Sequence, residues 1–299
     1  MLGELAALGA AICWTISAIL YKEALLNTKP ISANIVRCTC TGMVLIVCLA
    51  VIGKIGLLTN LPVYAVVLAS ASGIIGLGFG DTLYMVSLKL AGVARAVPIS
   101  CTYPLFSILL AILLQRQVVT VPVVLGAVAI VLGIWLLSQG EKTVGDEIQR
   151  SNLVKGAVSA LAAAIIWSVS IVLINMAVTL PETGGLDYAL ILNTLRVLAP
   201  AVFLLASAPI TDRRGSFLKT RKRPLVAFIL GGIVALAIGW FLLTMSFLYI
   251  PESEAVPISS ITPLFATMVG IIFLHEPVTA KIVLGSVIIV AGIFLIFMF

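Results

Sequence analysis

The sequence predicts an all-α integral membrane protein with ten transmembrane helices, arranged as two inverted five-helix repeats. Composition is the first observation, because 62% of the residues are hydrophobic, only 10% are charged and the mean hydropathy is +1.24. The second is a series of ten apolar segments of about 20 residues, the length that crosses a hydrocarbon core of about 30 Å. The third is a repeated phrase, AVPISCTYPLF from Ala96 and AVPISSITPLF from Ala255.

Short polar loops separate the ten expected spans, as in an antiparallel helical bundle. The longest polar intervals, 139–152 and 211–223, are too short for a separate soluble domain. The first span lacks the basic start and cleavage site of a secretory signal, so we expect it to be retained in the mature chain. The expected spans are 3–21, 32–53, 63–86, 93–114, 120–138, 153–176, 188–208, 225–248, 254–274 and 280–298.

The repeated phrase extends over both halves of the chain at an offset of 159 residues. The predicted units are a first five-helix repeat at 1–139, a polar linker at 140–152 and a second five-helix repeat at 153–299. Five is an odd number, so the second copy enters the membrane from the opposite side, and inverted copies are typical of alternating access. The offset aligns Arg37 with Arg196, Ser87 with Ser246, Gly126 with Gly285 and Gly133 with Gly292, whereas Trp14 matches Trp167 at 153.

Several short motifs carry a family resemblance over essentially the whole chain. They are W-x-x-S in each first helix (Trp14 and Ser17, Trp167 and Ser170), an arginine early in the second helix, P-L-F in the fourth and F-L-H-E-P closing the ninth. The chain resembles the drug/metabolite transporter superfamily, EamA type. The resemblance implies a ten-helix carrier whose cavity is lined by helices one to four and six to nine, with helices five and ten peripheral. It also implies substrates among amino acids, other small metabolites and drugs, and in relatives nucleotide sugars and triose phosphates.

One motif departs from symmetry. The second half has the acidic His275, Glu276 and Pro277 after its fourth helix, where the first half has Gln115, Arg116 and Gln117. A matched acidic pair at those two loops is therefore not expected.

Paired prolines interrupt two expected spans. Proline removes a backbone hydrogen bond and opens a carbonyl in the preceding turn, and interrupted helices in lipid line a cavity or other protein. We expect the hydroxyls between the prolines to face a polar solute. The alternative is a kink that serves packing, with those hydroxyls bonded to the preceding turn. The helix-kink residues are Pro98, Pro104, Pro257 and Pro263. Between them lie the hydroxyl residues Ser100, Thr102, Tyr103, Ser259, Ser260 and Thr262, of which Ser100, Tyr103, Ser259 and Thr262 are the candidates for substrate binding.

Three tryptophans, Trp14, Trp167 and Trp240, lie far from the interfacial belts where tryptophan usually concentrates. Together with Ser17 and Ser170 they are candidates for the floor of a substrate pocket, and interhelical packing is the alternative. The glycine-rich GIIGLGFG lacks the context of a phosphate-binding loop and indicates close helix packing instead. The glycine pairs 126/133 and 285/292 indicate a seam where two helices approach each other closely. We expect this seam to lie within one chain, and a contact between two chains of a dimer is the alternative.

Charged residues inside the spans are costly and functional by default. Arg37 and Arg196 either snorkel or cap backbone carbonyls, or else one of them contacts an anionic substrate group. Asp81, with Tyr84 on the same helical face, is a candidate to bind a proton or a substrate amine. Its alternative is an interfacial salt bridge to Lys89 or Arg95.

These observations favour a secondary transporter of a small polar metabolite, an amino acid or related compound, working by alternating access with proton coupling or exchange. The alternatives are a phosphate-ester or nucleotide-sugar antiporter, and in a different class a channel or lipid flippase. We expect no enzyme activity, cofactor or metal, and no nucleic-acid partner. The expected partners are the substrate and the lipid bilayer, for a monomer or homodimer in the cell membrane.

Orientation is open, because two signals disagree. Of the 18 Lys and Arg residues, fourteen fall in loops after odd-numbered spans and only Lys54 and Arg116 on the other side. Basic loops stay in the cytoplasm, so this count places both termini outside it. The family resemblance implies both termini inside.

Overall fold

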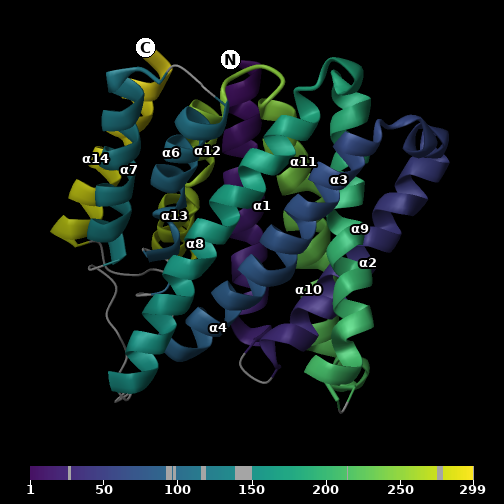
Figure 1. Cartoon of the computed structure of the whole chain (residues 1–299). Coiled ribbons are helices and arrows are strands. Elements are labelled where there is room, and N and C mark those ends of the chain that lie inside the picture. The colour runs from purple at the N-terminus through teal and green to yellow at the C-terminus, as the bar shows by residue number, and fades with distance from the viewer. Residues whose placement is uncertain are drawn as a thin grey trace.

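The computed structural model describes residues 1–25, 28–91, 96, 99–115, 119–138, 150–213, 215–274 and 279–298. Throughout this part of the chain the regular structure is helical, with no strand. The helices stand side by side, and both termini lie at the same end of the bundle (Figure 1). An all-helical arrangement satisfies every backbone hydrogen bond within each segment, which an apolar solvent requires.

Six stretches of helix are long and apolar enough to cross a bilayer, and they coincide with the first, second, third, sixth, seventh and eighth predicted spans. Four are single helices, and the third and eighth spans each carry a π-helical segment in the middle. Their elements are α1 (Leu2–Ala24), α2 (Pro30–Val51), α3 (Val63–Ser72), η2 (Gly73–Gly80), α4 (Asp81–Ala91), α8 (Arg150–Val178), α9 (Leu186–Thr211), α10 (Lys222–Gly232), η5 (Ile233–Gly239) and α11 (Trp240–Ser246). Short 3₁₀ turns, η1 (Ile55–Asn60), η3 (Pro181–Thr183) and η4 (Ser216–Lys219), lie between them.

The other predicted spans contain shorter apolar helices: α6 (Tyr103–Gln115), α7 (Val121–Ser138), α12 (Glu252–Ser259), α13 (Thr262–Leu274) and α14 (Ala280–Met298). The chain breaks at Ser260 and Ile261, inside the expected ninth span and between the two prolines that were expected to interrupt it. Pro263 has no N–H to give to the carbonyl of Ser259, and its ring crowds that carbonyl, so α12 ends there. In the fourth span α6 begins at Tyr103, and Pro98 lies outside the described residues.

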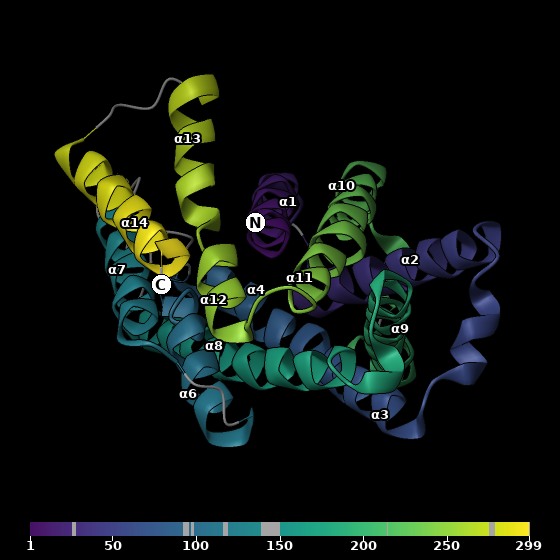
Figure 2. The same ribbon diagram turned by 90° about the horizontal axis from the view of Figure 1, so that it is seen from above.

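The glycine seam predicted from the sequence joins α7 to α14, which pack against each other at one edge of the bundle (Figure 2). A Cβ atom added to Gly126 would lie 2.6 Å from the carbonyl oxygen of Gly292, and one added to Gly133 would lie 2.7 Å from that of Gly285. Only glycine permits this backbone approach. The seam is therefore an intramolecular contact.

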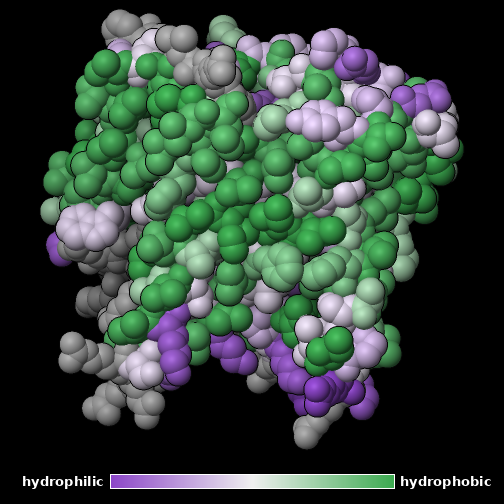
Figure 3. All heavy atoms as spheres, in the orientation of Figure 1, coloured by the Kyte–Doolittle hydropathy of each residue, from purple (hydrophilic) through white to green (hydrophobic). Residues whose placement is uncertain are grey.

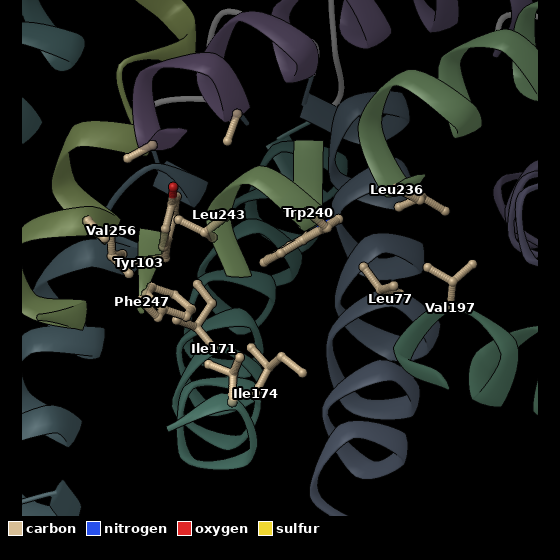
Figure 4. Close-up of a cluster of buried hydrophobic side chains, with 14 of the residues drawn as sticks. Leu77, Tyr103, Ile171, Ile174, Val197, Leu236, Trp240, Leu243, Phe247 and Val256 are labelled. Carbon is tan, nitrogen blue, oxygen red and sulfur yellow. The ribbon is translucent and has the colours of Figure 1, made fainter. Parts of the chain in front are cut away.

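Packing crosses between the two halves of the sequence. Helix α8 lies against α3, η2 and α4, whereas α1 lies against α10, η5 and α11. The first helix of each half thus packs on the third helix of the other half. The buried apolar cluster between these helices draws on both halves, with Leu77 and Ile171 beside Leu236 and Leu243 among its members (Figure 4).

The outer surface is apolar around the bundle and polar at its ends. Large apolar side chains such as Val158, Val202 and Phe294 are exposed, as a lipid-facing surface requires. The most hydrophilic atoms in Figure 3 gather at the lower end, opposite the termini, with a smaller group at the upper right. At the polar end, Asp212 accepts hydrogen bonds from Ser32 Oγ (3.0 Å) and the backbone N–H of Phe217 (2.9 Å), which joins the loop after α9 to α2.

Candidate functional site

The two π-helical segments, η2 and η5, lie at matching places in the two halves and are held in the same way. Asn34 Nδ2, on α2, donates to the carbonyl oxygens of Leu77 (2.7 Å) and Gly78 (3.3 Å). Asn193 Nδ2, on α9, donates to those of Leu236 (3.0 Å) and Ala237 (3.3 Å). Each residue of the second set is 159 positions after its counterpart. Turns of π-helix occur frequently at functional sites.

Asp81 begins α4, directly after the first π-helical segment, and both of its carboxylate oxygens are bonded. Arg37, on α2, forms an ion pair through Nη2 with Asp81 Oδ2 and also donates to Asn34 Oδ1 (3.0 Å). Trp167 Nε1, on α8, donates to Asp81 Oδ1 (2.8 Å). Asp81 is 8% exposed and Arg37 is 5% exposed. One buried carboxylate therefore connects α2 and α4 of the first half to α8 of the second.

Arg196 occupies the equivalent position in the second half, but its surroundings differ. Trp240 stands where the first half has Asp81, and the guanidinium carbon of Arg196 lies 3.5 Å from the centroid of that indole. Arg196 Nη2 donates to Ser170 Oγ (2.9 Å), and the residue is completely buried. The Trp240 ring also packs against Trp14, with the ring centroids 5.0 Å apart. An arginine stacked on one indole, which itself packs against a second, thus replaces the ion pair of the first half.

Each first-helix tryptophan fits against a glycine of the other half. A Cβ atom on Gly80 would lie 2.7 Å from Cδ1 of Trp167, and one on Gly239 would lie 2.9 Å from Nε1 of Trp14. Trp14 Nε1 donates to the carbonyl oxygen of Ala235 (3.3 Å). The tryptophans therefore close the contact between the halves at two related places.

Two tyrosines complete an aromatic group around Trp167. The Tyr84 ring lies 5.0 Å from it in a tilted arrangement, and the Tyr103 ring lies 6.0 Å away, edge to face. Tyr103 Oη is 3.5 Å from Ser259 Oγ, which links α6 to α12. This group lies next to Asp81, so the acid is enclosed by aromatic surface on the α8 side.

The hydroxyls between the paired prolines bond mainly to carbonyls of their own preceding turns. Thr102 Oγ1 donates to Ile99 (2.7 Å), Ser259 Oγ to Val256 (2.9 Å) and Ser260 Oγ to Pro257 (2.7 Å). Thr262 Oγ1 lies 3.4 Å from the carbonyl oxygen of Ala11 on α1, and Ser100 and Ser17 are buried. In this conformation the proline segments follow the packing alternative. Their opening to a solute stays a prediction.

A cavity of about 670 Å³ lies between the ends of several helices, at the end of the bundle that carries the termini. Its polar lining includes Tyr64, Asn175, Thr179 and Glu252. Glu252 is completely buried and accepts hydrogen bonds from Ser107 Oγ (2.5 Å) and Asn175 Nδ2 (2.9 Å). None of the predicted substrate-binding residues lines this cavity, because they pack against one another deeper in the bundle.

Comparison with known proteins decides the family. The model of the EamA-like transporter family matches residues 1–139 and 154–298. The chain belongs to the EamA-like transporter family. Members of this family are transporters rather than enzymes, and the several apolar helices make this EamA-like transporter a multi-pass membrane protein.

Two individual proteins resemble this EamA-like transporter over nearly its full length. An uncharacterized transporter of Archaeoglobus fulgidus is 27% identical over 297 residues, which cover 99% of this chain and 98% of the relative. A solved structure described only as "Crystal structure of protein" superposes with a TM-score of 0.77 at 19% identity, covering 98% of this chain and 95% of the other. That likeness shows the shared fold alone.

The sequence reasoning missed three residues that contribute to the interior of this EamA-like transporter. Asn34 and Asn193 carried a signal, because both are amides inside apolar spans and they are 159 residues apart. Glu252 lies just before the predicted start of the ninth span, whereas the structure places it in a buried first turn of α12. Arg116, Gln117, His275, Glu276 and Pro277 lie outside the described residues, so the asymmetry of those loops is untested.

Proposed function

We propose that this protein is a secondary transporter that moves a small polar metabolite, an amino acid or related compound, by alternating access. The observation that carries the proposal is the buried carboxylate of Asp81, held by Arg37 from α2 and by Trp167 from α8. Buried acids inside membrane spans are characteristic of proton relays and substrate sites. A passive helical scaffold has no need for one at the contact between its two halves.

A proton that binds to Asp81 would have a defined effect on the contact between the two halves. Protonation removes the carboxylate charge, so the ion pair with Arg37 and the charge-assisted hydrogen bond from Trp167 both weaken. The contact between α4 and α8 then loosens, and α8 separates from the first half. Loss of the proton on the other side of the membrane restores both bonds. Proton movement and the change of access are thereby linked through one residue.

The matching contacts at an offset of 159 residues support two inverted five-helix repeats as the basis of the mechanism. The pairs Asn34 and Asn193, Arg37 and Arg196, and the two π-helical segments occupy equivalent positions. Two inverted copies can exchange conformations, which opens a central site first to one side and then to the other. The cavity beside Glu252 gives the solute a polar entrance from the side of the termini.

Transport in proteoliposomes tests this function. The purified protein is reconstituted, a pH gradient is imposed, and uptake of radiolabelled amino acids, their amides and phosphate esters is measured. Uptake that saturates and is stimulated by counter-substrate inside the vesicles supports a carrier. Voltage-driven flux without saturation indicates a channel, scrambling of labelled lipid without solute uptake indicates a flippase, and strict phosphate-ester exchange indicates the antiporter alternative.

We expect both termini to lie outside the cytoplasm. The basic residues concentrate at the end of the bundle opposite the termini, where the hydrophilic surface of Figure 3 is most extensive. Segments rich in Lys and Arg resist translocation. Paired C-terminal fusions to green fluorescent protein and to alkaline phosphatase check this: phosphatase activity without fluorescence is expected, and bright cytoplasmic fluorescence would overturn the assignment.

A further inference from the structure

Arg196 is a buried cation whose charge is not neutralised by a direct partner. Its side chain is completely buried, and its hydrogen bond goes to a neutral hydroxyl, Ser170 Oγ. Nε and Nη1 have no hydrogen-bond partner among the described residues. A guanidinium offers five N–H donors, so most of the capacity of Arg196 is unused.

The charges in this part of the interior do not balance. Arg37 is neutralised by Asp81, but the repeat supplies no second carboxylate, because Trp240 occupies the equivalent position. Among the described residues at these two positions, two guanidinium groups and one carboxylate leave one excess positive charge. The face of an indole only partly offsets that charge, and an unpaired ion in a low-dielectric interior is strongly unfavourable. A negative group that enters during the transport cycle would remove the imbalance.

We propose that Arg196 binds an oxyanion group of the transported solute, a carboxylate or a phosphate ester. This inference rests on the proposed function and specifies its substrate class. A guanidinium recognises both oxyanions through paired N–H···O bonds, which an ammonium cannot form. Arg37 is the matched residue that does not bind the solute, since its charge is already taken by Asp81.

The position of Arg196 fits a site that opens when the halves separate. Arg196 lies on α9 of the second half, and its Nη2 would be 3.5 Å from a Cβ atom added to Gly76 of η2 in the first half. Gly76 has no side chain, so the backbone of η2 lies close to this edge of the guanidinium. When η2 moves away from α9, the open donors are exposed, beside the Trp240 ring that already lies against the guanidinium.

Thermal unfolding of the purified protein in detergent tests the site without knowledge of the natural substrate. Wild type, Arg196→Gln and Arg37→Gln are compared in sodium chloride, sodium acetate and sodium phosphate at equal ionic strength. We expect acetate, phosphate or both to raise the Tm of wild type and of any folded Arg37→Gln protein above the chloride value. The increase should vanish in Arg196→Gln. No increase in wild type, or an equal increase in Arg196→Gln, would overturn the proposal.

The Tm in chloride alone separates a ligand site from a structural role. Arg196→Gln removes an uncompensated charge, so its Tm should equal or exceed that of wild type, whereas Arg37→Gln leaves Asp81 stranded and should lower the Tm. A loss of folding in Arg196→Gln comparable to that in Arg37→Gln would make Arg196 structural and defeat the inference. Arg196→Lys should keep a reduced anion effect, since it retains charge without the planar fork.

The same proteins distinguish this inference from the function on which it rests. Anion-dependent stabilisation that requires Arg196, without solute uptake in proteoliposomes, would support the site and refute the transporter. Saturable uptake of amides and amines at wild-type rates by Arg196→Gln would support the transporter and refute the anion site. The acetate and phosphate arms identify which oxyanion the guanidinium prefers.

Discussion

Asp81→Asn is expected to abolish proton-driven uptake and to remove the pH dependence of any transport that remains. The amide keeps the shape of the carboxylate but cannot ionise, so it can neither carry a proton nor bind a substrate amine as an ion pair. The structure adds a stability effect, because Arg37 is then buried without its counter-charge. Breaking a buried pair on one side costs about 3–5 kcal/mol, so the Tm of the variant should fall as well.

The double variant Arg37→Gln/Asp81→Asn separates the two effects. It removes both charges, so its Tm should recover toward that of wild type, while proton-driven uptake should stay absent. Uptake by each protein is measured across imposed pH gradients in proteoliposomes containing equal amounts of folded protein. Wild-type uptake with an unchanged pH profile in Asp81→Asn would exclude a role of this carboxylate in coupling.

Gly73→Ala is expected to prevent normal folding. A Cβ atom on Gly73 would collide with the carbonyl oxygen of Arg196 and would come within 2.8 Å of its carbonyl carbon and 2.9 Å of Pro200 Cδ. The first two are backbone atoms of α9, so the helix itself would have to move. Overpacking of this kind costs about 1–3 kcal/mol and occasionally more. Thermostability measured by fluorescence-detected size-exclusion chromatography should show a lower Tm or an aggregated protein.

Gly78→Ala is the matched control from the same π-helical segment. The nearest atom to its added Cβ is Pro200 Cβ at 3.7 Å, an ordinary contact distance. This variant should keep the wild-type elution profile, with a free energy of unfolding changed by about 1 kcal/mol or less. Equal behaviour of the two variants would mean that η2 does not approach α9 as closely as the structure indicates.

The order of the helices was predictable from sequence, because hydropathy alone marks spans such as 32–53 and 188–208. A phrase that recurs with eight of its eleven residues identical fixes the offset of 159. The break between α12 and α13 was only half predictable. The prolines indicated a weakened helix, but the chain ends α12 fully, since Pro263 both lacks a donor and crowds the carbonyl of Ser259. Local sequence shows where a helix is weak. The packing of the surrounding helices determines whether it divides into two helices at that point.

The candidate site was predictable residue by residue but not in its pairings. Asp81, Arg37 and Trp167 each stood out as a polar or aromatic group inside an apolar span. That Arg37 turns to Asp81 depends on α2 lying beside α4, and that Trp167 reaches the same acid depends on α8 crossing from the other half. The π-helical segments were not predictable either, since Asn34 and Asn193 stabilise them through long-range contacts.

The crossed packing of α1 and α8 has a consequence for biosynthesis. Helix α8 packs against α3, η2 and α4. When only the first half has been inserted into the bilayer, Asp81 and Gly80 therefore lack their contacts with the indole of Trp167. Helix α1 likewise lacks its contacts until α10, η5 and α11, which belong to the second half of the chain, have been synthesised. Neither half can therefore complete its own interior, and the surfaces that later join the halves face lipid until the partner helices of the second half are inserted.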